Sequence, residues 1–217
     1  MSDHRGYMQM ENGWLSTVIE KRLRVDGMAA RGKESGFTML ELVVVIAIIA
    51  ILAAVAIPTA TLWLPNYYLR NAAMDIYANM QYAKTEAVRR NSPYAVVFDP
   101  GSDSFSLVSG PGADGVFGQG GDDVVVRTVN LSDYGKNIAF GKRNATINFD
   151  DGTGAFPADS VSYTADTIYA DNVVVFNSRG MCNAGSVYVQ NPNRTYAVGT
   201  LMSGILRIAS WGDGKWQ

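Results

Sequence analysis

The sequence has 217 residues, of which 47% are hydrophobic and 18% charged, and its formal net charge is -2. This length allows one globular domain beyond a membrane segment, and the mildly acidic balance argues against bulk binding of nucleic acid, which needs a basic face. A single cysteine, Cys182, excludes an intrachain disulfide framework. The only histidine, His4, lies near the N-terminus, so the rest of the chain has no histidine base or histidine metal site, and we expect no enzyme.

Residues 1–27 show no clear hydrophobic period, and an apolar stretch, Phe37–Leu64, begins after Gly36. This stretch exceeds the roughly 20 residues that span a hydrocarbon core, and it is too long for the apolar region of a secretory signal peptide. Arg31 and Lys33 precede it, while the bulk of the chain follows. The positive-inside rule therefore predicts a cytoplasmic N-terminus and a domain on the other side of the membrane.

One acid interrupts this apolar region. Glu41 directly precedes Leu42–Ile57, a run without any polar residue. A charged side chain in a membrane helix costs free energy, roughly 2.5–3.5 kcal/mol at the helix centre on insertion scales, so it predicts a function. If the chain were cut after Gly36, the new amino group of Phe37 would be a cation four residues from Glu41.

This pattern resembles the class III signal of type IV pilins and type II secretion pseudopilins. The matching residues are Gly36, Phe37, Thr38, Leu40, Glu41 and the apolar run up to Pro58. The resemblance implies that prepilin peptidase cleaves between Gly36 and Phe37, that Phe37 is then N-methylated, and that Glu41 steers filament assembly. The alternative is an ordinary signal anchor that happens to contain a glutamate.

The resemblance makes residues 1–36 a prepilin leader. Such leaders are usually short and basic, and the segment from Met28 to Gly36 would form one by itself. We therefore expect translation to begin at Met28, with a genuinely long leader as the alternative. Cleavage after Gly36 divides the net charge into +1 for the leader and -3 for the mature part, given the leader's six basic and five acidic residues.

The helical region continues after residue 64. Pro58 lies where pilins carry a proline inside the helix, and Pro65 disfavours helix at Leu64, so a second kink or a helix restart at Pro65 is an alternative. Residues 65–92 are predicted to form an amphipathic helix that packs on a sheet. Its apolar positions are Leu69, Ala73, Ile76, Met80, Ala83 and Ala87.

Residues 93–217 are predicted to form a β-rich globular domain. Nine short segments are rich in β-branched and aromatic residues and are separated by Gly, Pro, Asn or Asp. They are Tyr94–Phe98, Ser104–Val108, Val124–Val129, Asn137–Phe140, Thr146–Phe149, Val173–Phe176, Ser186–Gln190, Thr195–Val198 and Ile205–Trp211. The predicted fold class is α+β, with a long N-terminal hydrophobic helix followed by an antiparallel β-sandwich, as in pilins.

The C-terminal third resembles the GspH/FimT minor pilin family. In that family a Phe-x-x-x-Gly turn precedes three strands, the last of which has a Gly-x-x-Arg pattern. The matching segments are Phe176–Gly180, Gly185–Val189, Tyr196–Val198 and Gly204–Ile208.

Some family members that capture DNA carry Gly-Arg-x-Arg on the last strands. Here Ile205 replaces the first arginine, which leaves Arg207 with Arg194 and Lys215 as a small basic edge. We therefore do not expect this protein to bind nucleic acid. A role in DNA uptake is kept as an alternative.

A glycine-rich loop contains three acids, Asp114, Asp122 and Asp123. Clustered oxygen ligands suit Ca²⁺, so these three residues are a candidate calcium site, with ordinary solvated loop acids as the alternative. Residues 110–115 match G-x-G-x-x-G, but no helix follows, so a hairpin loop is expected in place of a dinucleotide site. No other cofactor is expected.

These observations together predict a minor pilin, a non-enzymatic structural subunit of a type IV pilus. The alternatives are a minor pseudopilin of a type II secretion system and a DNA-binding subunit of a pilus tip. The expected partners are other pilins or pseudopilins, prepilin peptidase and an assembly platform in the inner membrane. The expected location is the bacterial inner membrane, with the domain in the periplasm, followed by the filament.

Overall fold

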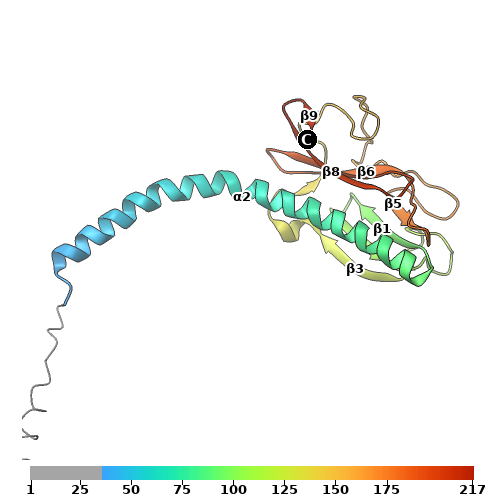
Figure 1. Cartoon of the computed structure of the whole chain (residues 1–217), viewed down its shortest axis with the longest axis horizontal. Coiled ribbons are helices and arrows are strands. Elements are labelled where there is room, and N and C mark those ends of the chain that lie inside the picture. Colours follow the sequence, from blue (N-terminus) through green and yellow to red (C-terminus); the bar gives the residue numbers. More distant parts are fainter. Residues whose placement is uncertain (1–35) are drawn as a thin grey trace, which may run out of the picture. The chain divides into compact units, whose positions relative to one another are not determined.

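The structure, a computed structural model, describes residues 36–217 (Figure 1). The predicted translation start at Met28 and most of the predicted leader lie outside the described residues. The chain divides into two compact units, the first ending at Leu52 and the second running from Ala53 to Gln217. The two units are described separately below, although one helix contributes to both.

That helix is α2, Met39–Arg90, with 52 residues. It is helical through Pro58 and Pro65, so the alternative of a helix restart at Pro65 is not observed. The part in the first unit exposes its apolar side chains. The span Met39–Ile57 is long and apolar enough to cross a membrane, and none of its most apolar window is buried.

The second part of α2 packs in the second unit. All six positions predicted from the helical spacing are fully buried, and Ala72 joins them. They face the inner side chains of two sheets in one core, which includes Phe98 and Phe105 from one sheet and Val187 and Val198 from the other. The spacing prediction for this segment is therefore confirmed, because burial follows the 3.6-residue period of the helix.

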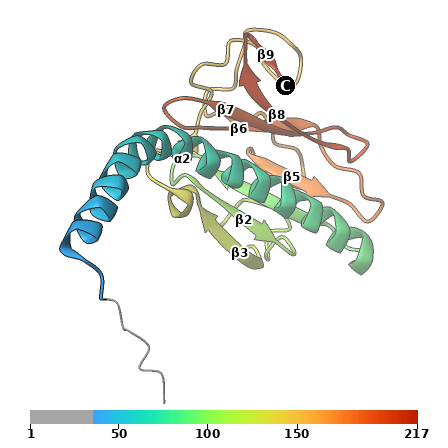
Figure 2. The same cartoon turned by 60° about the vertical axis from the view of Figure 1, so that its left-hand side comes forward.

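The first sheet has four antiparallel strands in the order β3-β2-β1-β5 (Figure 2). The strands are β1, Tyr94–Asp99, β2, Ser104–Val108, β3, Val125–Asn130, and β5, Val173–Phe176. Strand β3 is an exposed edge strand with a β-bulge opposite Leu107 and Val108. A 3-10 turn, η1, Leu131–Tyr134, follows it.

The second sheet has five antiparallel strands in the order β4-β6-β7-β8-β9. They are β4, Ala139–Phe140, β6, Gly185–Gln190, β7, Thr195–Thr200, β8, Leu206–Gly212, and β9, Lys215–Trp216. An apolar N-terminal helix followed by antiparallel sheets confirms the predicted α+β class.

One predicted strand is wrong. Residues 146–149 form no strand, because the backbone from Asn148 turns back on itself. The Asn148 N–H donates to the Thr153 carbonyl, and the Gly152 N–H donates to the Asn148 carbonyl at 3.1 Å. The short strand β9 was not predicted. It pairs with β8 through Trp211 and Trp216, whose rings lie 5.1 Å apart.

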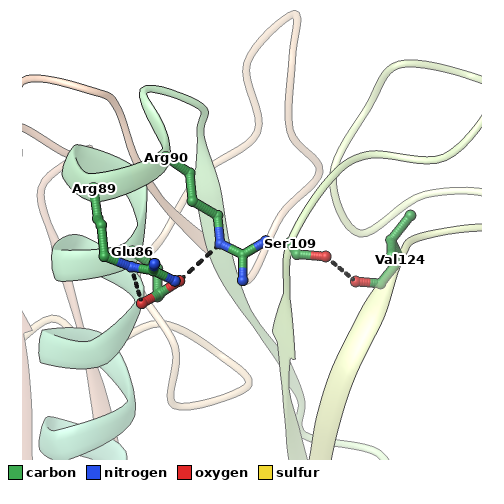
Figure 3. A network of polar contacts seen from close by, with 5 residues as sticks. All are labelled: Glu86, Arg89, Arg90, Ser109 and Val124. Carbon is green, nitrogen blue, oxygen red and sulfur yellow. Dashed lines mark hydrogen bonds and ion pairs between the residues drawn. The ribbon is translucent and has the colours of Figure 1, made fainter.

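A charged cluster holds the C-terminal end of α2 (Figure 3). Glu86, whose side chain is 8% exposed, accepts bonds from Arg89 at 2.6 and 2.8 Å and from Arg90 at 2.8 Å. Hydrogen bonds from Arg89 and then Arg90 lower the pKa of Glu86 to about 2. The two arginines also suit the negative end of the helix dipole. This cluster fixes the turn from α2 into β1, where Arg90 lies 5.7 Å from the Tyr94 ring centroid.

Candidate functional site

The predicted cleavage junction lies just outside the start of α2. Gly36 has open space where a side chain would be, and Phe37 is 80% exposed. Thr38 is the N-terminal cap, because its Oγ1 accepts the Glu41 N–H at 3.2 Å and its carbonyl accepts the Leu42 N–H at 3.2 Å. The cap stops the helix before Phe37, so the bond between Gly36 and Phe37 lies outside the helix and is accessible.

Glu41 has a local role that the sequence reasoning missed. It is the third residue of α2, and Thr38-x-x-Glu41 has the spacing of a capping box, in which an acid near the helix start is favourable. The signal is present in the sequence as the spacing of Thr38 and Glu41. The same residue is therefore suited to stabilise a helix start and to face a cation at residue 37.

The apolar side chains after Glu41 lack cover within the described residues. Val43, Ile48 and Leu52 are each about half exposed or more, and the rest of the run resembles them. An apolar surface of this extent needs lipid or other helices around it. This surface and the accessible junction together form the candidate processing and assembly site.

The two glycines of the C-terminal pattern have a structural role. Gly180 and Gly204 both have positive φ, +75° and +77°, and a Cβ on Gly204 would clash with the Gly180 carbonyl oxygen. Lys84 of α2 donates to the Gly204 carbonyl at 2.8 Å. The turn after β5 and the turn before β8 therefore meet against the helix. Only glycine fits where the two backbones meet, which explains the pattern without a ligand.

The three acids of the glycine-rich loop bond mainly to backbone N–H groups. Asp122 accepts from Ala113 at 2.5 Å, Asp114 accepts from Val116 at 2.9 Å, and Asp123 accepts from Gly118 at 2.8 Å. Burial, with the nearby charges of Asp114 and Asp122, raises the pKa of Asp123.

Across residues 36–217 no group of three His, Cys, Asp or Glu side chains is placed to hold a metal ion. The carboxylates of Asp114 and Asp122 do approach the same glycine, Gly120. Calcium binding at Asp114, Asp122 and Asp123 stays a prediction.

The candidate basic edge is not a single patch. Arg207 lies opposite Gly199 in the β7–β8 pairing. Gly199 is five residues from Arg194, which is about 16 Å along a strand. Its guanidinium lies 4.5 Å from the centroid of the Phe149 ring. Lys215 pairs with Gly212, five residues beyond Arg207. From the sequence, Arg194, Arg207 and Lys215 are predicted to form one basic edge. The strand register instead separates Arg207 from Arg194 and Lys215.

Cys182 belongs to the core. It is buried, its thiol donates to the Leu201 carbonyl at 3.3 Å, and burial raises the pKa of the thiol. A buried thiol with a raised pKa is a poor nucleophile.

Comparison with family models identifies both halves of this arrangement. The model described as Type II transport protein GspH matches residues 72–204, and the model of the prokaryotic N-terminal methylation motif matches residues 31–57. The chain belongs to the GspH family. Its members with this N-terminal motif are minor pilins and pseudopilins, so the GspH match and the methylation motif agree with the sequence-based resemblance.

Solved structures to which this chain is similar include the type IV minor pilin FimU of Pseudomonas aeruginosa. One FimU structure is 15% identical, with a TM-score of 0.42, covering 71% of this chain and 96% of that one. The minor pseudopilin EpsH from the type II secretion system of Vibrio cholerae is 14% identical, with a TM-score of 0.43, covering 68% of this chain and 97% of that one. No curated protein matches the chain.

Proposed function

We propose that this GspH-family chain is a minor subunit of a type IV pilus. One observation supports this most strongly. A single helix begins at an accessible Gly36–Phe37 junction, exposes its apolar first part, and buries its second part in the domain. A soluble protein gains nothing from such a helix, whereas a filament subunit uses the exposed part twice, first in the membrane and then against neighbouring helices.

The proposed mechanism is assembly. The apolar part of α2 stores the subunit in the inner membrane, with the domain in the periplasm. Prepilin peptidase cleaves after Gly36, and the Phe37 amine is methylated. Glu41 of an incoming subunit then pairs with the Phe37 amine of a neighbour, because a buried charge without a partner is strongly unfavourable. This pairing selects the axial register of the helices as they bundle on the assembly platform.

A second candidate is a minor pseudopilin of a type II secretion system. The description of the matched family as a type II transport protein favours it. The two candidates share every step above and differ in the filament that the subunit joins. Deleting the gene distinguishes them, because loss of surface pili with normal protein secretion supports the pilus. Secreted proteins retained in the periplasm, with normal pili, would support the pseudopilus.

Processing tests the shared part of the proposal. Intact-mass analysis of membrane-extracted protein should find a chain that begins at Phe37 and carries one added methyl group. Gly36→Ala should leave the leader attached, because the peptidase must fit the smallest residue before the cut. Gly32→Ala, four residues upstream, is the matched control and should be processed normally. A mature N-terminus at another residue, or full processing of Gly36→Ala, would contradict the proposal.

A further inference from the structure

Three aromatic side chains follow the apolar span, and we call them the aromatic cluster: Trp63, Tyr67 and Tyr68. Trp63 is 60% exposed, and its ring stacks on that of Tyr67, with centroids 5.3 Å apart and an interplanar angle of 21°. The ring of Tyr68 lies 6.1 Å from that of Tyr67. Exposed, mutually stacked aromatic rings next to an apolar helix are typical of the layer where hydrocarbon meets water.

The position of the cluster along the helix fits this layer. The charge-free part of α2 lies between Glu41 and Arg70 and has 28 residues. That number of helical residues has a contour length of about 42 Å, close to the roughly 40–45 Å of a bilayer with its headgroup regions. When Glu41 lies at the cytoplasmic edge of the hydrocarbon core, roughly the next 20 residues cross that core. Trp63 is then among the first residues beyond the opposite edge of the core.

The domain begins directly after the cluster. Asn191, in the turn between β6 and β7, donates to the Pro65 carbonyl at 2.9 Å. The Tyr68 ring lies against Gly135, where a Cβ would come within 3.2 Å of it. These two contacts identify the end of the domain that must face the membrane, because the helix enters there.

Exposed basic residues gather at this end, and we call them the basic group: Arg70, Lys136, Arg143 and Arg194. Lys136 follows Gly135, and the Arg143 Nε donates to the Pro192 carbonyl at 3.1 Å. The Arg194 N–H donates to the Asn191 side chain at 2.7 Å. Three acids lie at the same end: Asp133 in η1, Asp213 near Arg194, and Asp103, whose carboxylate accepts the Phe140 N–H. The four residues of the basic group therefore oppose three acids.

We infer that the aromatic cluster and the basic group form a membrane-docking surface for anionic lipid headgroups, used before assembly. The aromatic cluster lies at the headgroup level of the leaflet on the domain's side, and the basic group binds lipid phosphates. A mature part with net charge -3 would otherwise be repelled by an anionic leaflet, so a basic end orients the domain. This inference rests on the proposed function, since it requires a chain that resides in the membrane.

Depth-dependent quenching tests the aromatic cluster. Full-length protein is reconstituted in vesicles whose lipids carry bromine at shallow or deep acyl positions, and the Trp63 signal is the difference between wild type and Trp63→Phe. Shallow bromine should quench this signal about twofold more than deep bromine, as expected for an interfacial ring. Equal quenching at both depths, or none, would overturn the inference.

A labelled cysteine tests the basic group. Asn193→Cys places a dye beside Arg194, and the native Cys182 is buried and so reacts poorly. A quencher on the lipid headgroup should act about twofold more strongly in vesicles containing phosphatidylglycerol than in neutral vesicles. This increase in quenching with phosphatidylglycerol should vanish in the double variant Lys136→Glu/Arg194→Glu. It should also vanish at about 1 M salt, where the Debye length is about 3 Å. Arg179→Glu, which reverses a charge in the turn that packs against the far end of α2, should keep it.

The outcomes separate this inference from the proposed function. A chain that fails to float with vesicles would overturn both. A chain that floats, yet shows a water-exposed Trp63 and no effect of anionic lipid, would overturn only the docking surface. If in addition Tyr67→Ala lowered incorporation into filaments and Tyr82→Ala did not, the cluster would contact a neighbouring subunit and not lipid. Tyr82 is the matched control because it is 48% exposed, against 46% for Tyr67.

Discussion

The two parts of α2 share one backbone conformation and have opposite surroundings. From Leu42 to Ile57 the helix is apolar on every side and exposed, whereas from Leu69 to Ala87 it is apolar along one stripe and that stripe is buried. The first part has no cover inside the described chain, so its stability as a helix depends on lipid or on other subunits. The second part is covered by the two sheets. In the proposed filament, one helix therefore serves both an intermolecular and an intramolecular interface.

The largest expected effect concerns the intermolecular part. Glu41→Ala should still insert into the membrane and still be cleaved, but it should enter filaments poorly. A neighbour's Phe37 amine would be buried without its counter-charge, at a cost of about 3–5 kcal/mol. Glu41→Gln should be nearly as poor, because it keeps the shape and loses the charge. Sheared filaments probed for this subunit give the measurement.

Thr38→Ala is the control for the Glu41 variants. It removes the cap on the Glu41 N–H and leaves the carboxylate, so it should cost only about 1 kcal/mol of helix stability. If Thr38→Ala impaired assembly as strongly as Glu41→Ala, the capping role would explain the result. Normal incorporation of both Glu41 variants would show that this acid does not pair with an amine.

A second prediction concerns the intramolecular part. Met80 is fully buried between the helix and the sheets, and Met74 on the same helix is 46% exposed. Met80→Ala should lower the free energy of unfolding by about 2–5 kcal/mol, because it leaves a cavity in the core. Met74→Ala should change it by less than about 0.5 kcal/mol. Thermal melting of the detergent-solubilised mature protein measures both, and equal shifts would mean that the helix is not packed as described.

A smaller effect concerns the end of the packed part. The folded-state pKa of Glu86, about 2, lies below its ordinary value of 4.5. A depressed pKa contributes stability above pH 4.5, and this contribution is lost as the pH falls from 4.5 through 2. Glu86→Gln should therefore have a lower melting temperature than the wild type at pH 7. The difference between the two melting temperatures should shrink as the pH falls towards 2. Asp213→Asn, at an exposed carboxylate in the turn between β8 and β9, should show no such convergence.

The smallest expected effect concerns the glycine-rich loop. If Asp114, Asp122 and Asp123 bind Ca²⁺, millimolar calcium should raise the melting temperature, because a ligand that binds only the native state stabilises it. Asp123→Asn should abolish the shift, and Asp151→Asn, in another exposed loop, should keep it. Identical melting in calcium and in chelator, for the wild-type protein, would remove calcium from this loop.

The fold of the helical region could be predicted from the sequence because its signals are local. The length of the apolar run, the glutamate at its start and the spacing of Leu69, Ile76 and Met80 all depend on neighbours within a few turns. Most strands were predictable for the same reason. The segment Thr146–Phe149 has the composition of a strand but not the structure of one, because a strand requires a partner and here the backbone bonds to itself.

The sequence by itself predicted the cleavage junction and the candidate membrane span, and it determined the helix stripe and the fold class. Only the tertiary structure decided which side chains meet. The crossing of Gly180 with Gly204, the stacking of Arg207 on Phe149 and the contact of Asn191 with Pro65 join residues far apart in the chain. Such contacts depend on strand register and on turn geometry, which shift by whole residues without any change in local pattern. Local periodicity therefore predicts the elements, while their packing decides which residues form the proposed docking surface.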